Sequence, residues 1–143
     1  WSHWMTPESN GSEMRFLPTM FRLLFTALLS TLVTLNVGAG ESVKILVQSS
    51  PLAGSQYYAL SAVWAEIRHG DKLLLTREPD NRHDANAIRV EWKGQRLGYV
   101  PRAENRALAA AMDRGERVEA RVSALRRAKN PWQRVEFEVY LVL

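Results

Sequence analysis

The most informative segment of the chain reads Arg77-Glu78-Pro79-Asp80-Asn81-Arg82-His83-Asp84-Ala85-Asn86-Ala87-Ile88-Arg89-Val90. Its first part is a short, highly polar loop, and its last residues already alternate between apolar and charged side chains. Asp and Asn side chains hydrogen-bond to neighbouring backbone amides, so a loop rich in them is stiff. A stiff polar loop held between two strands is a common position for binding residues. We therefore expect this polar loop to carry the function of the chain.

The segments on both sides of the polar loop predict a set of neighbouring strands. Residues 72–78 predict a strand whose apolar middle, Leu73-Leu74-Leu75, indicates burial on both faces. After the loop, Ile88, Val90 and Trp92 alternate with charged residues, which predicts a half-buried strand. Lys-Gly at 93–94 then predicts a hairpin turn, and residues 95–100 form the partner strand.

The rest of the chain extends this pattern into a small domain at residues 42–143. Further strands are predicted at 43–48, 116–125 and 132–143, and the main helix at 102–114, between Pro101 and Gly115. Residues 62–67 predict one helical turn with Trp64 and Ile67 facing inward. The expected fold is mainly β: a small OB-like, partly closed β-barrel of about six strands with one main α-helix.

Composition limits the classes of function. The chain has 143 residues and a formal net charge of +4, with a pI near 9.8. This balance favours an anionic partner such as nucleic acid or a membrane surface. Because the chain has no cysteine, disulfides and cysteine-based zinc sites are excluded.

The N-terminal third follows a different pattern from the domain. Residues 1–13 are interpreted as a remnant that precedes a start at Met14. Residues 14–39 combine two Arg with an uncharged apolar run and small residues near Ala39, which is typical of a secretory signal peptide. The chain is therefore expected to be exported, to the periplasm or outside the cell. The alternatives are a hydrophobic helix that anchors it to the inner membrane and contacts lipid there, or an amphipathic helix packed on the domain.

Four segments together resemble the HIRAN domain family: Gly54-Ser55-Gln56-Tyr57-Tyr58, Gly70-Asp71-Lys72-Leu73-Leu74-Leu75, the stretch 77–90, and Leu97-Gly98-Tyr99-Val100-Pro101-Arg102. The resemblance covers residues 47–142 and implies an OB-like barrel. The family occurs at the N-terminus of helicase-like DNA repair proteins and alone in bacteria. The resemblance therefore implies a module that binds single-stranded DNA and holds a free 3′-hydroxyl end. The chain has no phosphate-loop motif, so the resemblance does not imply ATP hydrolysis.

The resemblance also implies which residues bind the strand end. Tyr57 matches the Tyr that stacks on a terminal base, and Gln56 replaces the basic residue before it. Asp84 matches the Asp that accepts a hydrogen bond from the 3′-hydroxyl. The remaining positions are the loop residue Asn81 with Asp80 beside it, His83 in place of a second stacking aromatic, the basic residue Arg102 and the late aromatic Trp132.

The residue types support the same chemistry without the resemblance. The rings of Tyr57, His83 and Trp132 can stack on bases, each contributing about 1–3 kcal/mol. A carboxylate such as Asp84 repels phosphate but accepts from a hydroxyl, so it favours a free 3′ end. Phosphates in the strand would be neutralised by basic side chains, namely Arg102, Arg126, Arg127, Lys129 and Arg134.

Purely structural roles remain open for several of these residues. Asp84 and Asn81 would equally serve to brace the loop by hydrogen bonds, and Asn86 is interpreted as a structural residue. Tyr57 and Tyr58 alternate, so one of the two is expected in the core. Trp64 and Trp92 are both interpreted as core residues.

The sequence favours a binding module over an enzyme, because it contains no nucleophile–base pair, carboxylate dyad or phosphate loop. Neither a cofactor nor a metal is expected, and single-stranded DNA is the expected partner. Two alternatives stay open. One is an extracytoplasmic domain that binds a protein partner or an envelope polymer. The other is a metal-dependent hydrolase built on Asp80, His83 and Asp84.

Overall fold

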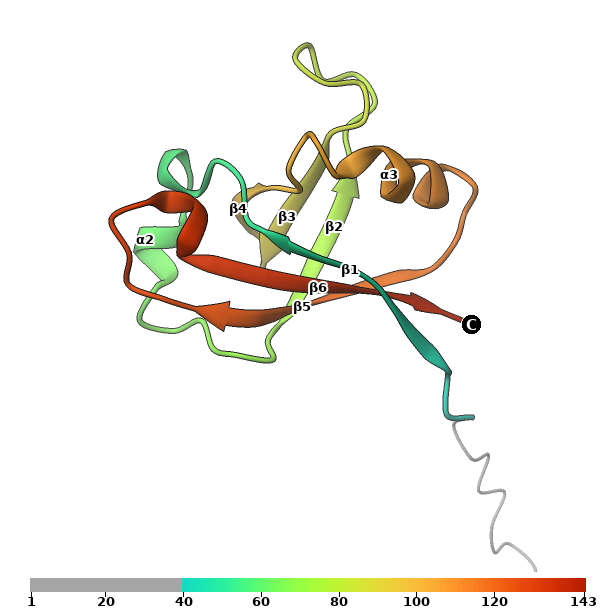
Figure 1. Cartoon of the computed structure of the whole chain (residues 1–143), viewed down its shortest axis with the longest axis horizontal. Coiled ribbons are helices and arrows are strands. Elements are labelled where there is room, and N and C mark those ends of the chain that lie inside the picture. The colour runs from blue at the N-terminus through green and yellow to red at the C-terminus, as the bar shows by residue number, and fades with distance from the viewer. Residues whose placement is uncertain (1–39) are drawn as a thin grey trace, which may run out of the picture. The chain divides into compact units, whose positions relative to one another are not determined.

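The computed structural model describes residues 40–143. Six antiparallel strands form one sheet in the order β1-β6-β5-β2-β3-β4 (Figure 1). Their bounds are β1 Lys44–Pro51, β2 Lys72–Arg77, β3 Ile88–Trp92, β4 Gln95–Tyr99, β5 Val118–Leu125 and β6 Val135–Val142. One main helix, α3 (Asn105–Asp113), accompanies a short helix α2 (Leu60–Val63) and two 3-10 turns, η1 (Ser55–Tyr57) and η2 (Pro131–Gln133). The expected mainly β fold with six strands and one main helix is confirmed, and it is consistent with a small OB-like domain.

The predicted N-terminal helix, signal peptide and membrane anchor all lie outside the described residues. Within residues 40–143, neither helix has the length and apolar character needed to cross a bilayer.

The two ends of the sheet meet at one point. Ala53, just after β1, and Tyr99 at the end of β4 exchange two backbone hydrogen bonds of 2.9 and 3.0 Å. Gly98 makes this approach possible, because a Cβ atom there would lie 2.3 Å from the carbonyl oxygen of Ala53. The contact joins the ends of the sheet as in a partly closed barrel, and it brings η1 beside β4.

The core lies between the sheet and the helices. Ile88, Val90 and Trp92 are all buried, which confirms the alternation predicted for this strand. Ile67 is also buried, as predicted, and α3 contributes Leu108 to the same cluster. The hairpin at Lys93-Gly94 is confirmed, with φ angles of 45° and 79° at the two residues.

Four details of the sequence interpretation are wrong. Leu74 is 61% exposed, because β2 has one face outside the core. Trp132 lies in the η2 turn and not in the closing strand, which begins at Val135. The helix begins at Asn105, after a turn at 101–104. Trp64 packs against the core with only part of its side chain and is half-buried.

Candidate functional site

The polar loop, residues 78–87, is stiffened by its own side chains. Asn81 donates from Nδ2 to Glu78 Oε2 at 3.0 Å, and its Oδ1 accepts from the backbone N–H of His83 at 2.9 Å. These bonds are the local closures that Asn residues make in turns. Asp80 and His83 are left exposed at the surface of the loop. In Figure 1 the loop projects beyond the ends of β2 and β3, above α3.

Asp84 connects the loop to the main helix. Its Oδ1 accepts from the backbone N–H of Asn86 at 2.9 Å, and its Oδ2 accepts from Asn105 Nδ2 at 2.6 Å. Asn105 is the first residue of α3, and only 1% of it is exposed. The carboxylate therefore braces the loop, as one of the two sequence interpretations proposed. Each oxygen keeps a further lone pair, since a carboxylate can accept about four hydrogen bonds.

Glu78 is the centre of a polar cluster on the outer face of β3 and β4. Its carboxylate accepts from Tyr99 Oη at 2.8 Å and from Arg89 Nη1 at 3.1 Å, in addition to Asn81. Partial burial alone would raise the pKa of the Glu78 carboxyl. The hydrogen bonds from Asn81 and Tyr99 and the charges of Arg89 and Arg96 outweigh burial and hold that pKa below its usual value.

The hydrogen bond between Tyr99 and Glu78 shifts the pKa of the Tyr99 hydroxyl upward, whereas it lowers the pKa of Glu78. Burial, together with the hydrogen bond to the Glu78 carboxylate, raises the pKa of the Tyr99 hydroxyl to about 12. The hydroxyl therefore stays protonated at neutral pH and acts as a permanent donor to Glu78. This bond ties the end of β4 to the start of the polar loop.

Tyr57, the last residue of η1, and Tyr58, the residue after it, have different environments. Tyr57 is 77% exposed, so its ring is free to serve as a stacking surface. Tyr58 is half-buried, with its ring centre 5.8 Å from that of Tyr99 and 5.4 Å from the guanidinium carbon of Arg96. Neither tyrosine belongs to the buried core, so the expectation that one of the two is a core residue is wrong, and Tyr58 packs instead against Tyr99 and Arg96.

Arg102 lies exposed in the turn between β4 and α3. The turn is closed by a backbone bond from Glu104 N–H to the carbonyl of Pro101, at 2.9 Å. Glu104 also accepts from the hydroxyl of buried Ser50 at 2.5 Å, which fixes the turn to β1. The backbone that carries Arg102 is thus held from two sides.

These contacts make Tyr99 the meeting point of three segments. Its backbone pairs with Ala53, four residues before Tyr57. Its hydroxyl binds Glu78 at the start of the polar loop, and Arg102 follows three residues later in the chain. The segments that carry Tyr57, Asp84 and Arg102 therefore adjoin the same end of β4.

A second group of predicted residues lines a hollow of about 740 Å³ between α2 and the loop 126–134. We call this hollow the basic pocket; its polar and aromatic lining consists of Ser55, Gln56, Ser61, Trp64, Arg126, Arg127, Lys129 and Arg134. Ser55 and Pro131 connect η1 with η2 by a hydroxyl–carbonyl contact of 3.5 Å. Tyr57 and Trp132, which is 49% exposed, therefore lie on adjacent turns.

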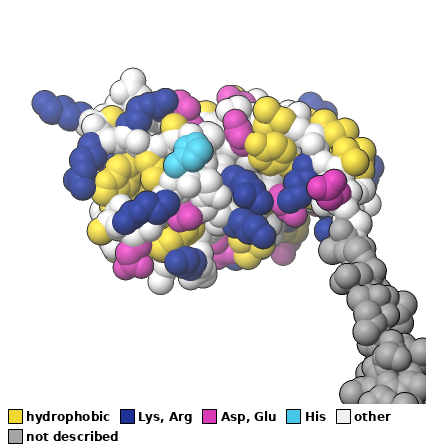
Figure 2. Space-filling model, turned by 90° about the horizontal axis from the view of Figure 1, so that it is seen from below, with side chains coloured by type: hydrophobic (Ala, Val, Ile, Leu, Met, Phe, Trp, Pro, Cys, Tyr) yellow, Lys and Arg dark blue, Asp and Glu magenta, His cyan; other side chains and the backbone are white. Residues whose placement is uncertain are grey.

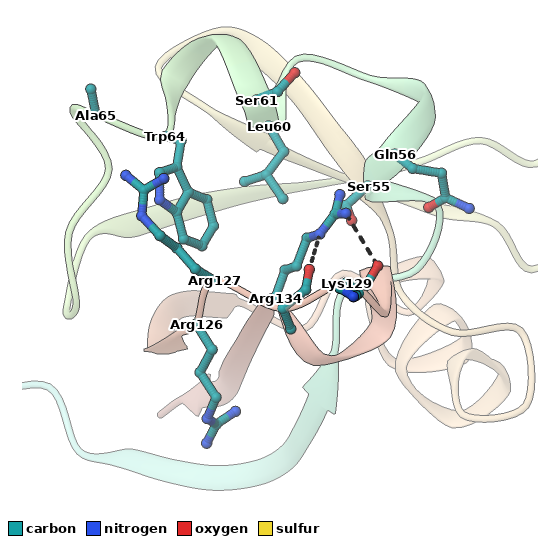
Figure 3. A pocket seen from close by; sticks show the side chains of 11 residues that line it. Ser55, Gln56, Leu60, Ser61, Trp64, Ala65, Arg126, Arg127, Lys129 and Arg134 are labelled. Carbon is teal, nitrogen blue, oxygen red and sulfur yellow. Dashed lines mark hydrogen bonds between the residues drawn. The ribbon is translucent and has the colours of Figure 1, made fainter.

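The basic side chains of this group are not equivalent (Figure 3). Arg134 donates to the carbonyls of Ala128 and Lys129 at 2.9 and 3.3 Å, so it holds the loop in shape. Arg126 forms an ion pair with Glu136 at 3.0 Å and points out of the pocket. Arg127 lies over the ring of Trp64, 5.9 Å from its centre. Arg134 therefore has a structural role in the loop, and the phosphate contact predicted for it stays a prediction.

The predicted site residues consequently fall into two sets. Tyr57, Arg102 and the polar loop adjoin β4, whereas Gln56, Arg127 and Lys129 surround the basic pocket. Figure 2 shows Lys and Arg side chains around apolar atoms at the end of the domain that carries α2 in Figure 1. Sequence reasoning missed four residues: Glu78, Arg96, Trp64 and Asn105. Only Arg96 had a usable signal, because it alternates with buried Leu97 on a predicted strand.

The polar loop does not assemble a metal centre. Over residues 40–143, no three His, Asp or Glu side chains are grouped so that they could hold a metal ion. Asp80 and His83 are exposed, and the Asp84 carboxylate is turned toward Asn86 and Asn105 by its two hydrogen bonds. The metal-dependent hydrolase alternative therefore gains no support from residues 40–143.

Comparison with known proteins gives a consistent result. Residues 45–143 match the sequence model of the HIRAN domain. A crystallised protein from Lactobacillus plantarum is similar in structure, with a TM-score of 0.62 and 28% identity over 71% of this chain and 97% of that one. The crystallised HIRAN domain of human HLTF shares the fold, with a TM-score of 0.54 and 22% identity over 73% and 80% of the two chains. No curated protein matches the sequence.

Proposed function

The chain belongs to the HIRAN domain family, whose domains are nucleic-acid binding modules, and from this premise we propose that its site holds the free 3′-hydroxyl end of single-stranded DNA. The observation that carries the proposal is the junction at Tyr99. The backbone of Tyr99 pairs with the segment that leads to Tyr57, and its hydroxyl bonds to the start of the polar loop. Arg102 follows Tyr99 by three residues in the chain. The proposal is supported because the segments that carry an aromatic ring, a carboxylate and a cation adjoin one end of β4.

Each side chain has a role that follows from its environment. Tyr57 supplies a flat, exposed surface for the terminal base, and His83 on the polar loop offers a second ring. Arg102 is exposed on a fixed turn and neutralises a backbone phosphate. Trp132 on η2 extends the stacking surface from the adjacent turn.

Asp84 distinguishes a free end from a continuing strand. Its carboxylate is oriented by Asn86 and Asn105, and its remaining lone pairs can accept from a sugar hydroxyl. A 3′-phosphate in the same place would bring two negative charges together, which is unfavourable. The bracing role of Asp84 therefore supports the binding role, because the bonds to the protein hold the acceptor still.

The test is a fluorescence anisotropy titration with 5′-labelled oligonucleotides that end in a 3′-hydroxyl or a 3′-phosphate. The native chain should prefer the 3′-hydroxyl strand. The isosteric substitution Asp84→Asn should abolish this preference, since the amide no longer repels the phosphate. In that variant the Asn105 amide can turn its oxygen toward residue 84, so the loop brace is kept. Equal affinity of the native chain for both strands would reject the role of Asp84.

For location, we propose export directed by residues 14–39. The support is the sequence pattern of two Arg, an apolar run and small residues near Ala39. Fractionation of cells that carry a reporter fused after Leu143 tests this proposal. A cytoplasmic reporter would contradict it. Failure of the native chain to bind any oligonucleotide at low salt would favour the alternative ligand, an envelope polymer or a protein.

A further inference from the structure

The basic pocket is built from two segments that lie about 70 positions apart in the sequence, and no role in end binding accounts for its aromatic wall. We propose that it holds an internal nucleotide of the bound strand, at least two positions upstream of the terminal one. The inference rests on the proposed function and extends it: the domain would grip the strand at its end and again in this pocket. The volume of about 740 Å³ lies in the usual range of small-ligand sites.

Trp64 provides the surface for a base. Its indole is half-buried against the core, which fixes the ring, and its other side faces the pocket (Figure 3). Arg127 lies over this ring at 5.9 Å, in the way a guanidinium stacks on an aromatic face. A base can take the place of the guanidinium on the ring or stack beside it, since every base has a π-face.

The charge of the pocket fits a phosphate. Arg127, Lys129 and Arg134 line it, together with Arg126, and no Asp or Glu is among its lining residues. Arg134 is committed to the loop carbonyls, and Arg126 is paired with Glu136. Lys129 and Arg127 are therefore the cations that remain for a ligand, and both are exposed.

The position of the pocket fits a continuous strand. Ser55 and Gln56 line it, and Tyr57 is the next residue of the same η1 turn. A strand whose last base stacks on Tyr57 therefore passes directly to the pocket with its preceding nucleotides. The uncharged amide of Gln56 stands at the boundary between the two places, where it can hydrogen-bond to a base or a sugar.

The experiment compares a thymidine dinucleotide with an octamer, both 5′-labelled and both ending in a 3′-hydroxyl, against the whole chain. Trp64→Leu should weaken octamer binding at least fivefold and leave dinucleotide binding unchanged. Trp64→Phe keeps an aromatic ring and should retain most of the octamer affinity. Lys129→Gln should lower the slope of log K against log salt by about 0.7 for the octamer alone. Lys93→Gln, which removes one charge from the β3–β4 hairpin outside the pocket, is the matched control.

The outcomes separate this inference from the proposed function. If Trp64→Leu and Lys129→Gln, both folded by thermal melting, bind the octamer like the native chain, the pocket inference is wrong while end binding stands. If the 3′-hydroxyl preference is absent but octamer binding still depends on Trp64, end binding fails and the pocket holds a strand on its own. If the native chain binds neither oligonucleotide, both are overturned.

Discussion

Asn105 Nδ2 donates to Asp84 Oδ2 at 2.6 Å, and this bond joins the polar loop to the first residue of α3 across 21 positions of sequence. The Asn105 amide is almost entirely buried, so the bond satisfies a polar group that water cannot reach. It also fixes the direction of the Asp84 carboxylate. Loop stability and the proposed recognition of a strand end therefore depend on the same contact.

Replacing Asn105 by Ala should lower the free energy of unfolding by about 1–3 kcal/mol, because an oriented buried hydrogen bond is lost and the carboxylate loses a partner. Urea unfolding followed by tryptophan fluorescence measures the change. Asn86→Ala is the control, since only the backbone N–H of Asn86 bonds to Asp84. Equal stability of both variants would show that the loop is not braced through α3.

Substitution of Tyr57 separates binding from stability. Because its side chain is 77% exposed, Tyr57→Ala should change the free energy of unfolding by less than about 0.5 kcal/mol. The same variant should bind a 3′-hydroxyl oligonucleotide more weakly by about 1–3 kcal/mol, the contribution of one stacked base. Tyr57→Phe keeps the ring and should bind normally. Unchanged affinity of the Ala variant would remove Tyr57 from the proposed site.

Arg102 is expected to act through charge alone. Arg102→Gln should reduce the slope of log K against log salt by about 0.7, the value for one phosphate contact in a single strand. Anisotropy titrations at several salt concentrations give the slope. Arg117→Gln removes an exposed charge just before β5 and should leave the slope unchanged. The same slope for both variants would place Arg102 outside the path of the strand.

The sequence was sufficient to predict a strand and its buried face where apolar and polar residues alternate along one segment. The period of two in Ile88, Val90 and Trp92 predicted β3 and its inward face, and all three residues are buried. The run Leu73-Leu74-Leu75 carries no such alternation, so the exposed face of β2 at Leu74 could not be distinguished. Local patterns therefore report which residues are apolar, but only alternation reports the direction of each side chain.

The site was less predictable, because its contacts join distant segments. The resemblance assigned a role to Asp84, yet its partner Asn105 lies on another element, and no local pattern marks that residue as buried. Trp64 was interpreted as core from its size and class alone. Its half-exposed position depends on the loop 126–134, which packs beside α2 only in the folded chain.

Stability at high pH should depend on Tyr99. A group whose folded pKa is raised contributes stability that is complete below its unfolded pKa, near 10, and is lost as pH rises to the folded value of about 12. The Tyr99→Phe variant has no ionisable hydroxyl. The difference in the free energy of unfolding between the native chain and this variant should therefore shrink between pH 10 and 12. Urea unfolding at intervals across this range measures it. In Glu78→Gln the carboxylate that helps raise the folded pKa of Tyr99 is gone, so the loss of stability should still begin near pH 10 but be smaller and level off at a lower pH. A constant advantage of the native chain would contradict the Tyr99–Glu78 coupling.

Gly98 tests whether closure of the sheet positions the site. A Cβ atom at this position would lie 2.3 Å from the carbonyl oxygen of Ala53 and 3.1 Å from a methyl carbon of Leu52, so Gly98→Ala must push the two segments apart. We expect a loss of about 1–3 kcal/mol in the free energy of unfolding, as for other overpacked positions. Because the Ala53–Tyr99 pair also carries η1 toward β4, oligonucleotide affinity should fall in the same variant. Gly94→Ala is the control: it also replaces a glycine of positive φ, but nothing lies within 4 Å of its added Cβ atom. If Gly98→Ala loses stability yet binds the 3′-hydroxyl strand with native affinity, the contact between Ala53 and Tyr99 closes the sheet without positioning Tyr57.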